Sequence, residues 1–174
     1  MIDKCTNFLD NGKEVDIVYT DFEKAFDKVP HQRLLSKLRS YALGCDVVSW
    51  IEAFLCSRVQ NVKINGILSQ PKPVLSGIPQ GSVLGPLLFI SFINDIPSVC
   101  DKLSEMFLFA DDAKLYKCIS SDLDHLSLIE SCQNLMQRCE LWCMKLNLEK
   151  CKVLTLFKTK PKYFVPVFNI NYKG

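Results

Sequence analysis

Short runs of alternating apolar and polar residues are separated by longer runs in which apolar residues recur every three or four positions. The alternating runs are rich in β-branched and aromatic side chains, which favours strands. Strands are predicted at residues 15–20, 106–110, 113–118 and 153–157. The pair Asp111-Asp112 stands between the second and third of these runs. Because aspartate is common in turns, those two strands are predicted to form a hairpin.

Helical spacing covers much of the remaining chain. Helices are predicted at residues 31–42, 47–55, 83–95 and 123–146. Ser82 and Ser121 are the predicted N-caps of the last two. The dipeptide Asn65-Gly66 closes an alternating run and predicts a further hairpin. The pattern therefore predicts an α/β (α+β) fold, in which a four-stranded antiparallel sheet of ferredoxin or RRM type is backed by two long helices and carries an added hairpin.

Composition limits the number of domains and the cellular compartment that the chain can be expected to have. The 174 residues are 48% hydrophobic, which is enough for one domain with a core. No apolar run reaches the roughly 20 residues of a bilayer span, so no membrane partner is expected. The nine cysteines lack zinc-site spacing and no signal peptide is evident, which predicts an intracellular, reducing compartment, either nucleus or cytoplasm. Residues 145–174 carry a net charge of +6 within a total of +2, which suits a phosphate backbone, although a solvated tail explains it equally well.

Three aspartates stand where predicted strands end. Asp21 closes the first strand, and Asp111 and Asp112 lie between the second and third. Mg²⁺ prefers oxygen ligands, and two such ions can stabilise both the attacking and the leaving oxygen of a phosphoryl transfer. A turn between strands lets adjacent aspartates reach one site. Two plainer interpretations stay open: Asp21 as a helix N-cap, and Asp111-Asp112 as an exposed turn.

Four strings of residues carry a resemblance to a known family. They are Tyr19–Asp27, Gly77–Ser82, Phe109–Asp112 and Trp142–Leu154. In this order they resemble motifs A, B, C and D of a reverse transcriptase palm, above all that of non-LTR retrotransposons. The resemblance covers residues 5–158, and it implies a polymerase palm fold.

The resemblance implies roles for individual residues. It makes Asp21, Asp111 and Asp112 catalytic ligands of two Mg²⁺ (or Mn²⁺) ions, with Asp112 contacting metal less directly. Their carboxylates are then expected within roughly 4–8 Å of one another. It also places Lys150 near the leaving pyrophosphate, where a lysine of suitable pKa could act as a general acid. A solvated surface lysine is the alternative for Lys150.

The same resemblance places Phe22, Phe26, Gln80 and Gly81 in the dNTP pocket. An aromatic ring at Phe26 would clash with a ribose 2′-hydroxyl, which implies a preference for deoxynucleotides. Packing in the core is the alternative for Phe26. A Gly-Pro loop that leads into a core helix would explain Gly81 but not Gln80.

The implied function is RNA-directed DNA synthesis in retrotransposition, by nucleotidyl transfer of dNTPs onto a primer 3′-hydroxyl. An RNA template and a DNA primer are the implied partners. Residues 1–158 are expected to form the palm, and residues 159–174 a basic tail or the start of a thumb connection. Because fingers and thumb are largely missing, an inactive retroelement remnant that at most binds nucleic acid is the alternative. A viral RNA polymerase or a nucleotide cyclase is disfavoured, since such RNA polymerases usually carry glycine where this chain has Ala110.

Overall fold

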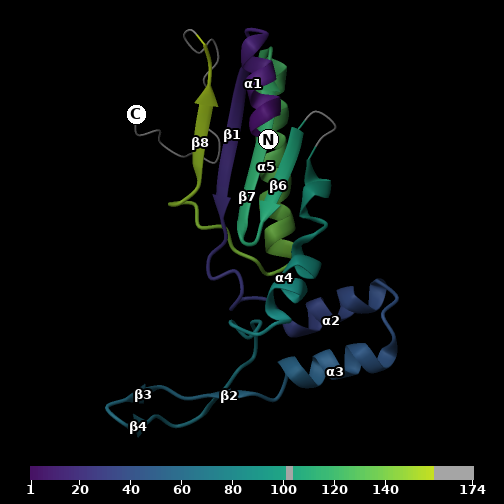
Figure 1. The fold of residues 1–174 in the computed structure, drawn as a ribbon, viewed down its shortest axis with the longest axis vertical. Helices are drawn as coiled ribbons and strands as arrows, with labels where there is room; N and C mark the ends of the chain where they lie inside the picture. Colours follow the sequence, from purple (N-terminus) through teal and green to yellow (C-terminus); the bar gives the residue numbers. More distant parts are fainter. Residues whose placement is uncertain (101–103, 159–174) are drawn as a thin grey trace. The chain divides into compact units, whose positions relative to one another are not determined.

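The computed structural model describes residues 1–100 and 104–158 (Figure 1). Contacts between residues divide the chain into two compact units. The first unit combines residues 1–23 with the chain from residue 95 onward, and the second unit is residues 24–94. The predicted tail at 159–174 lies outside the described residues.

The first unit is built on a four-stranded sheet, as predicted. Its strands are β1 (Glu14–Asp21), β6 (Ser104–Phe109), β7 (Asp112–Ile119) and β8 (Lys152–Leu156). They lie in the order β6-β7-β1-β8, and every neighbouring pair is antiparallel. Strand β1 is central, because it pairs with β7 along its whole length and with β8 from Val15 to Tyr19. The mixed α/β class with an antiparallel sheet is confirmed.

The two faces of this sheet have different coverings. On one face Val18 and Leu115 pack with Leu128 and Cys132 of α5 (Asp122–Leu141). On the other face Cys5 of α1 (Ile2–Asp10) packs with apolar residues of β1 and β7. Helix α1 was not among the predicted elements. Successive residues of a strand point to opposite faces, so each position on β1 belongs to either the α5 side or the α1 side.

Helix α5 begins as predicted but buries a different stripe. Ser121 is its N-cap and forms a capping box with Asp124. The predicted stripe included Leu123 and Leu126, yet these are 75% and 59% exposed. The prediction was wrong for these two leucines, although Cys132 and Cys139 of the same series are buried. The helix presents an overlapping stripe to the core, made of His125, Leu128, Ser131, Cys132, Leu135 and Cys139. The helix also ends at Leu141 rather than continuing to residue 146.

A row of polar residues crosses the sheet beneath α5. Asp16 pairs in register with Lys117 of β7 and with Thr155 of β8. Thr155 Oγ1 donates a hydrogen bond of 2.6 Å to Asp16 Oδ1, and His125 Nδ1 lies 3.3 Å from Asp16 Oδ2. Burial raises the pKa of Asp16, although Thr155 and His125 act in the opposite direction.

The second unit carries three helices and the added hairpin. The helices are α2 (His31–Ser40), α3 (Cys45–Leu55) and α4 (Gly85–Ile93), and the hairpin consists of β2 (Val59–Gln60), β3 (Lys63–Ile64), β4 (Ile67–Leu68) and β5 (Lys72–Pro73). The Asn65-Gly66 turn has two positive φ angles, as the dipeptide predicts. The prediction that Ser82 caps α4 was wrong. Its hydroxyl accepts a hydrogen bond from Gly85 N within the preceding turn, and the N-cap is Leu84.

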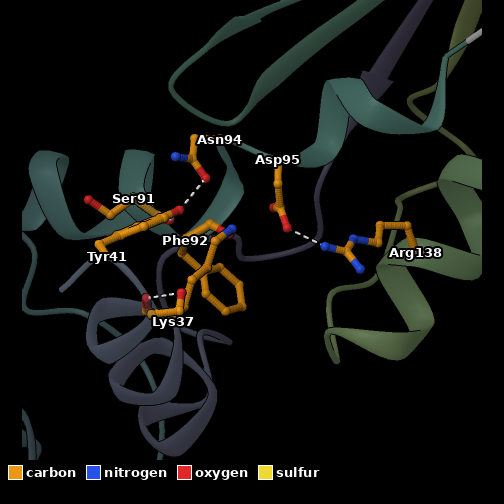
Figure 2. A network of polar contacts seen from close by, with 8 residues as sticks. Lys37, Tyr41, Ser91, Phe92, Asn94, Asp95 and Arg138 are labelled. Carbon is orange, nitrogen blue, oxygen red and sulfur yellow. Dashed lines mark hydrogen bonds and ion pairs between the residues drawn. The ribbon is translucent and has the colours of Figure 1, made fainter.

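Side chains of α2 hold the C-terminal end of α4 (Figure 2). The buried Lys37 Nζ donates a hydrogen bond of 2.6 Å to Phe92 O, one of the last carbonyls of the helix. Tyr41 donates to Asn94 Oδ1 at 2.6 Å. A cation and a donor at this end suit the negative pole of the helix dipole. In the first unit, Asp95 and Arg138 form an ion pair, also drawn in Figure 2.

A short 3₁₀ helix, η1 (Ile96–Val99), follows Asp95 and contacts α5 in the first unit. Among residues 1–100 and 104–158, no helix combines the length and the apolar character needed to cross a bilayer.

Candidate active site

Two of the three candidate metal ligands are direct neighbours across the sheet. Asp21 is the last residue of β1, Asp112 is the first residue of β7, and the two are register partners. Partners in an antiparallel pair share a face, with Cβ atoms roughly 4.5–5.5 Å apart. No helix begins between Asp21 and Pro30, so the alternative of Asp21 as a helix N-cap is wrong. Two carboxylates thus meet at one end of the central strand pair.

Asp111 lies in the turn that joins β6 to β7. The turn consists of Ala110 and Asp111, and Phe109 pairs with Asp112 across it. Ala110 adopts a φ of +51°. Asp111 and Asp112 are both exposed. Within the described part of the chain, no three His, Cys, Asp or Glu side chains gather closely enough to hold a metal ion. The convergence of all three aspartates therefore stays a prediction.

The motif D segment is tied directly to the end of β1. Asn147 N donates a hydrogen bond of 2.8 Å to Asp21 O, and Phe22 forms an isolated β-bridge with Leu146. This pairing brings Lys150 Nζ to 3.5 Å from Asp21 Oδ2. The lysine side chain is 66% exposed, so the ion pair adds little to stability. Its consequence is positional, since a cation stands beside the candidate metal ligand.

Further cations line the same face of the sheet. Tyr19 lies two residues before Asp21 and pairs with Lys114 on β7 and Lys152 on β8. The Lys114 ammonium lies 5.1 Å from the centroid of the Tyr19 ring, a cation–π contact. A cavity of about 750 Å³ is lined by these residues together with Asp21, Asp112 and Lys150. Glu149 also lines this cavity, so the site combines three carboxylates with three lysines.

The roles of Tyr19, Lys114 and Lys152 were missed from the sequence. Tyr19 could have been found, because alternation along a strand places it on the face of Asp21. The two lysines could not, because only the register of β7 and β8 against β1 brings them there.

The predicted pocket residue Phe22 is buried, with 3% of its surface exposed, and it lines neither of the two cavities described for this protein.

The other predicted pocket residues belong to the second unit. Phe26 stacks on Phe89 of α4, with ring centroids 4.2 Å apart and an interplanar angle of 21°. Gln80 Nε2 donates a hydrogen bond of 2.9 Å to Asp27 Oδ1. Gly81 has a φ of +77° and is exposed. Motif A residues after Glu23 are therefore joined to motif B within one unit.

A second cavity lies in this unit. It measures about 970 Å³, and its lining includes Lys24, Asp27, Arg58, Gly77 and Gln80. Phe26 and Gly81 are not among its lining residues. Of the predicted pocket residues in this unit, only Gln80 therefore faces a cavity.

Comparisons with known proteins agree with the motifs. The family described as reverse transcriptase (RNA-dependent DNA polymerase) matches residues 3–168. The RNA-directed DNA polymerase from mobile element jockey of Drosophila melanogaster is 34% identical over 144 residues, which cover 79% of this chain and 16% of that protein. A probable RNA-directed DNA polymerase from transposon BS of the same organism is 30% identical over 148 residues, covering 81% of this chain and 16% of that protein.

Solved structures show the same fold at low identity. An apo telomerase from Candida tropicalis superposes with a TM-score of 0.65 over 94% of this chain and 36% of that chain, at 12% identity. The predicted polymerase palm fold and the resemblance to non-LTR retrotransposon polymerases are confirmed. The chain spans only 16% of the length of the curated relatives named above. Since one family matches from residue 3 to residue 168, the chain belongs to the reverse transcriptase (RNA-dependent DNA polymerase) family.

Proposed function

We propose that this chain is the catalytic palm of an RNA-directed DNA polymerase, which transfers dNTPs onto a primer 3′-hydroxyl. The observation that carries the proposal is the pairing of Asp21 with Asp112 at the exposed end of the central strands. An ionised carboxylate next to another is repelled unless a cation compensates, so this pair favours a bound cation. The family match supports the same chemistry.

The donors present fit a divalent metal. Asp21 and Asp112 share a face, Asp111 is the residue before Asp112, and all three offer the oxygen ligands that Mg²⁺ and Mn²⁺ prefer. These residues would hold two ions. When bound, such ions stabilise charge on the attacking and leaving oxygens of an in-line displacement.

Lys150 is proposed to interact with the leaving pyrophosphate. Its ammonium lies 3.5 Å from Asp21 Oδ2 and is well exposed, so it can turn toward a ligand in the cavity on this face. A lysine there can donate a proton to the departing pyrophosphate or neutralise its charge. Lys114 and Lys152 would offer two further cations to the phosphates of a bound triphosphate.

Phe26, Gln80 and Gly81 are proposed to complete the dNTP pocket, together with Phe22. Stacking on Phe89 fixes the Phe26 ring, and a fixed ring is what exclusion of a 2′-hydroxyl requires. Asp27 holds the Gln80 amide in one orientation, which suits a side chain that contacts a nascent base pair. An RNA template and a DNA primer are the proposed partners; a solved relative is a telomerase in complex with a fragment of telomeric RNA.

Primer extension tests the proposal. The chain is completed with the fingers and thumb of a relative, because positioning the primer and triphosphate supplies much of the catalysis. Asp21→Asn and Asp111→Ala should each abolish Mg²⁺-dependent extension. Asp10→Ala, at an exposed aspartate on α1, is the matched control and should extend normally.

The outcomes separate the candidate functions. Extension that survives Asp111→Ala would refute the catalytic assignment. A completed chain that binds primer–template but never extends it would identify the palm as the inactive remnant. The unmodified 174-residue chain should show little or no processive synthesis, since it spans only 16% of the length of its polymerase relatives and positioning of primer and triphosphate supplies much of the catalysis.

A further inference from the structure

Within residues 24–94, no helix covers the two-stranded ribbon of the second unit. The ribbon is residues 58–74, which contain β2, β3, β4 and β5. Every residue from Val59 to Pro73 is exposed. Its strands make their main contacts with each other only: β2 with β5 and β3 with β4. Figure 1 shows the two arms extending from α3 to the β3–β4 end.

The chain segment that contains the ribbon carries positive charges only. From Ala53 to Asn94 the chain contains no aspartate or glutamate. Its three cations, Arg58, Lys63 and Lys72, all lie on the ribbon. Asp27 lines the cavity at the base of the ribbon together with Arg58, but the ribbon itself carries only positive charges, which suits the phosphates of a nucleic acid.

The polar side chains of the ribbon are mostly amides. Gln60 pairs in register with Lys72, so an amide and a cation share one face. Asn61 Nδ2 donates a hydrogen bond of 2.7 Å to Ser69 O and braces the two arms where the regular pairing is interrupted. Amides and cations together are the side chains that contact base edges in a minor groove.

The end of the ribbon is apolar. Ile64 and Ile67 are register partners on either side of the Asn65-Gly66 turn, and they are 66% and 76% exposed. Partners share a face, so the two isoleucines form one apolar edge at the tip. Apolar side chains at such a position can wedge against base pairs from the minor groove.

The edges of the ribbon limit how a protein could bind it. Pro71 and Pro73 lie on the return arm, and proline cannot donate a hydrogen bond to an added strand. Strand addition at that edge is therefore disfavoured, and contacts must be made by side chains. The charge and the amides favour a nucleic acid over an apolar protein surface.

We propose that the ribbon binds a nucleic-acid duplex, with its cations on the phosphates and its isoleucine tip in the minor groove. One arm from Val59 to Ile64 spans roughly 20 Å when extended, enough to cross a groove. The ribbon contains none of the residues proposed as metal ligands. It rests on the proposed function only for the choice of an RNA–DNA hybrid as the first partner.

Fluorescence anisotropy with a labelled RNA–DNA hybrid tests the proposal on the full 174-residue chain. The triple variant Arg58→Gln/Lys63→Gln/Lys72→Gln should bind at least about tenfold more weakly at low salt, and the slope of log K against log salt should fall by about 2–3. The double variant Ile64→Ser/Ile67→Ser should bind several-fold more weakly with an unchanged slope, because it removes no charge.

Matched controls remove similar groups elsewhere. Lys13→Gln/Arg33→Gln/Arg39→Gln takes three cations from exposed positions outside the ribbon, and Val47→Ser takes an exposed apolar side chain from α3. Both should bind like the parent. Circular dichroism checks that every variant is folded, which is the more necessary for Arg58 because its side chain is partly buried, unlike residues 59–73.

Two results would overturn the inference. One is an unchanged affinity and salt slope in the triple variant. The other is an isoleucine variant that binds the duplex normally but loses self-association in sedimentation, which would assign the tip to contacts between copies. Because binding is measured without synthesis, failure here is distinct from failure of Asp111→Ala to abolish extension.

Discussion

Replacement of Gly77 by alanine should disrupt the seam between motifs A and B. Gly77 has a φ of +93°, and a Cβ at this position would lie 2.7 Å from Asp27 O and 2.9 Å from Asp27 Cα. These are backbone atoms, so no side-chain rotation can relieve the contact. Either the motif B turn or the segment around Asp27 must move.

The loss of folding stability in Gly77→Ala has two contributions. A side chain at positive φ costs about 1–2 kcal/mol. Separation of the two segments also weakens the hydrogen bonds that join them: Gly77 N donates to Val29 O, and Ile78 N donates to Phe26 O, each at 2.9 Å. At about 0.5–1.5 kcal/mol for each bond, Gly77→Ala should lower the free energy of unfolding by about 2–5 kcal/mol in total.

Gly66→Ala is the matched control. Gly66 has a similar φ of +85°, but no atom lies within 4 Å of a Cβ built there. It should therefore cost only the backbone contribution, about 1–2 kcal/mol. Urea unfolding followed by far-ultraviolet circular dichroism measures both variants. Equal destabilisation of the two would refute the reasoning, because the contact with Asp27 would then carry no energy.

Three further predictions follow from burial and packing. Burial raises the pKa of Asp16 in the folded protein above its value in the unfolded chain. The protonated side chain therefore stabilises the fold fully at a pH below the pKa of the unfolded chain, and this stabilisation is lost as the pH rises through the pKa of the folded protein. Asp16→Asn should flatten the fall in unfolding free energy above about pH 4, and an equally steep fall would contradict this. Burial raises the pKa of Cys132 to about 12, so a thiol reagent at neutral pH should label Cys132 far more slowly than the exposed Cys45. Mass spectrometry measures the two labelling rates, and equal rates would mean that α5 opens readily. Phe26→Val, in the chain completed with fingers and thumb, should admit ribonucleotides while DNA synthesis continues, and an unchanged dNTP-to-rNTP ratio would assign Phe26 to core packing alone.

Local patterns in the sequence were sufficient for most of the elements, although not for helix α1. The run that ends at Asp21, the acidic hairpin before Asp112 and the Asn65-Gly66 turn all lie where the pattern predicts them. Strand alternation and turn chemistry depend on neighbours along the chain, so the sequence alone carries that information. The capping box at Ser121 is likewise a local signal, read from residues three positions apart. The family also followed from short strings of residues, because each string is local.

Pairing in space was decided only by the tertiary structure. Sequence reasoning grouped Asp111 and Asp112 with Asp21, but the register of β1 against β7 makes Asp112 the direct partner. A shift of one residue would turn each side chain of a strand to the other face, and nothing within a single strand sets that register. The same non-local pairing brings Lys114 and Lys152 beside Tyr19.

The buried face of a helix was likewise decided by the tertiary structure, although its existence was predicted from the sequence. The spacing of apolar residues predicted α5, yet Leu123 and Leu126 face solvent, because an overlapping stripe that includes His125 packs on the sheet. An amphipathic pattern with several apolar residues allows more than one stripe, and the sheet decides which one is buried. The sequence by itself determined most of the elements, with α1 as an exception, and the family that they belong to. The tertiary structure decided which of their side chains meet, because strand register and helix rotation are settled by partners distant along the chain.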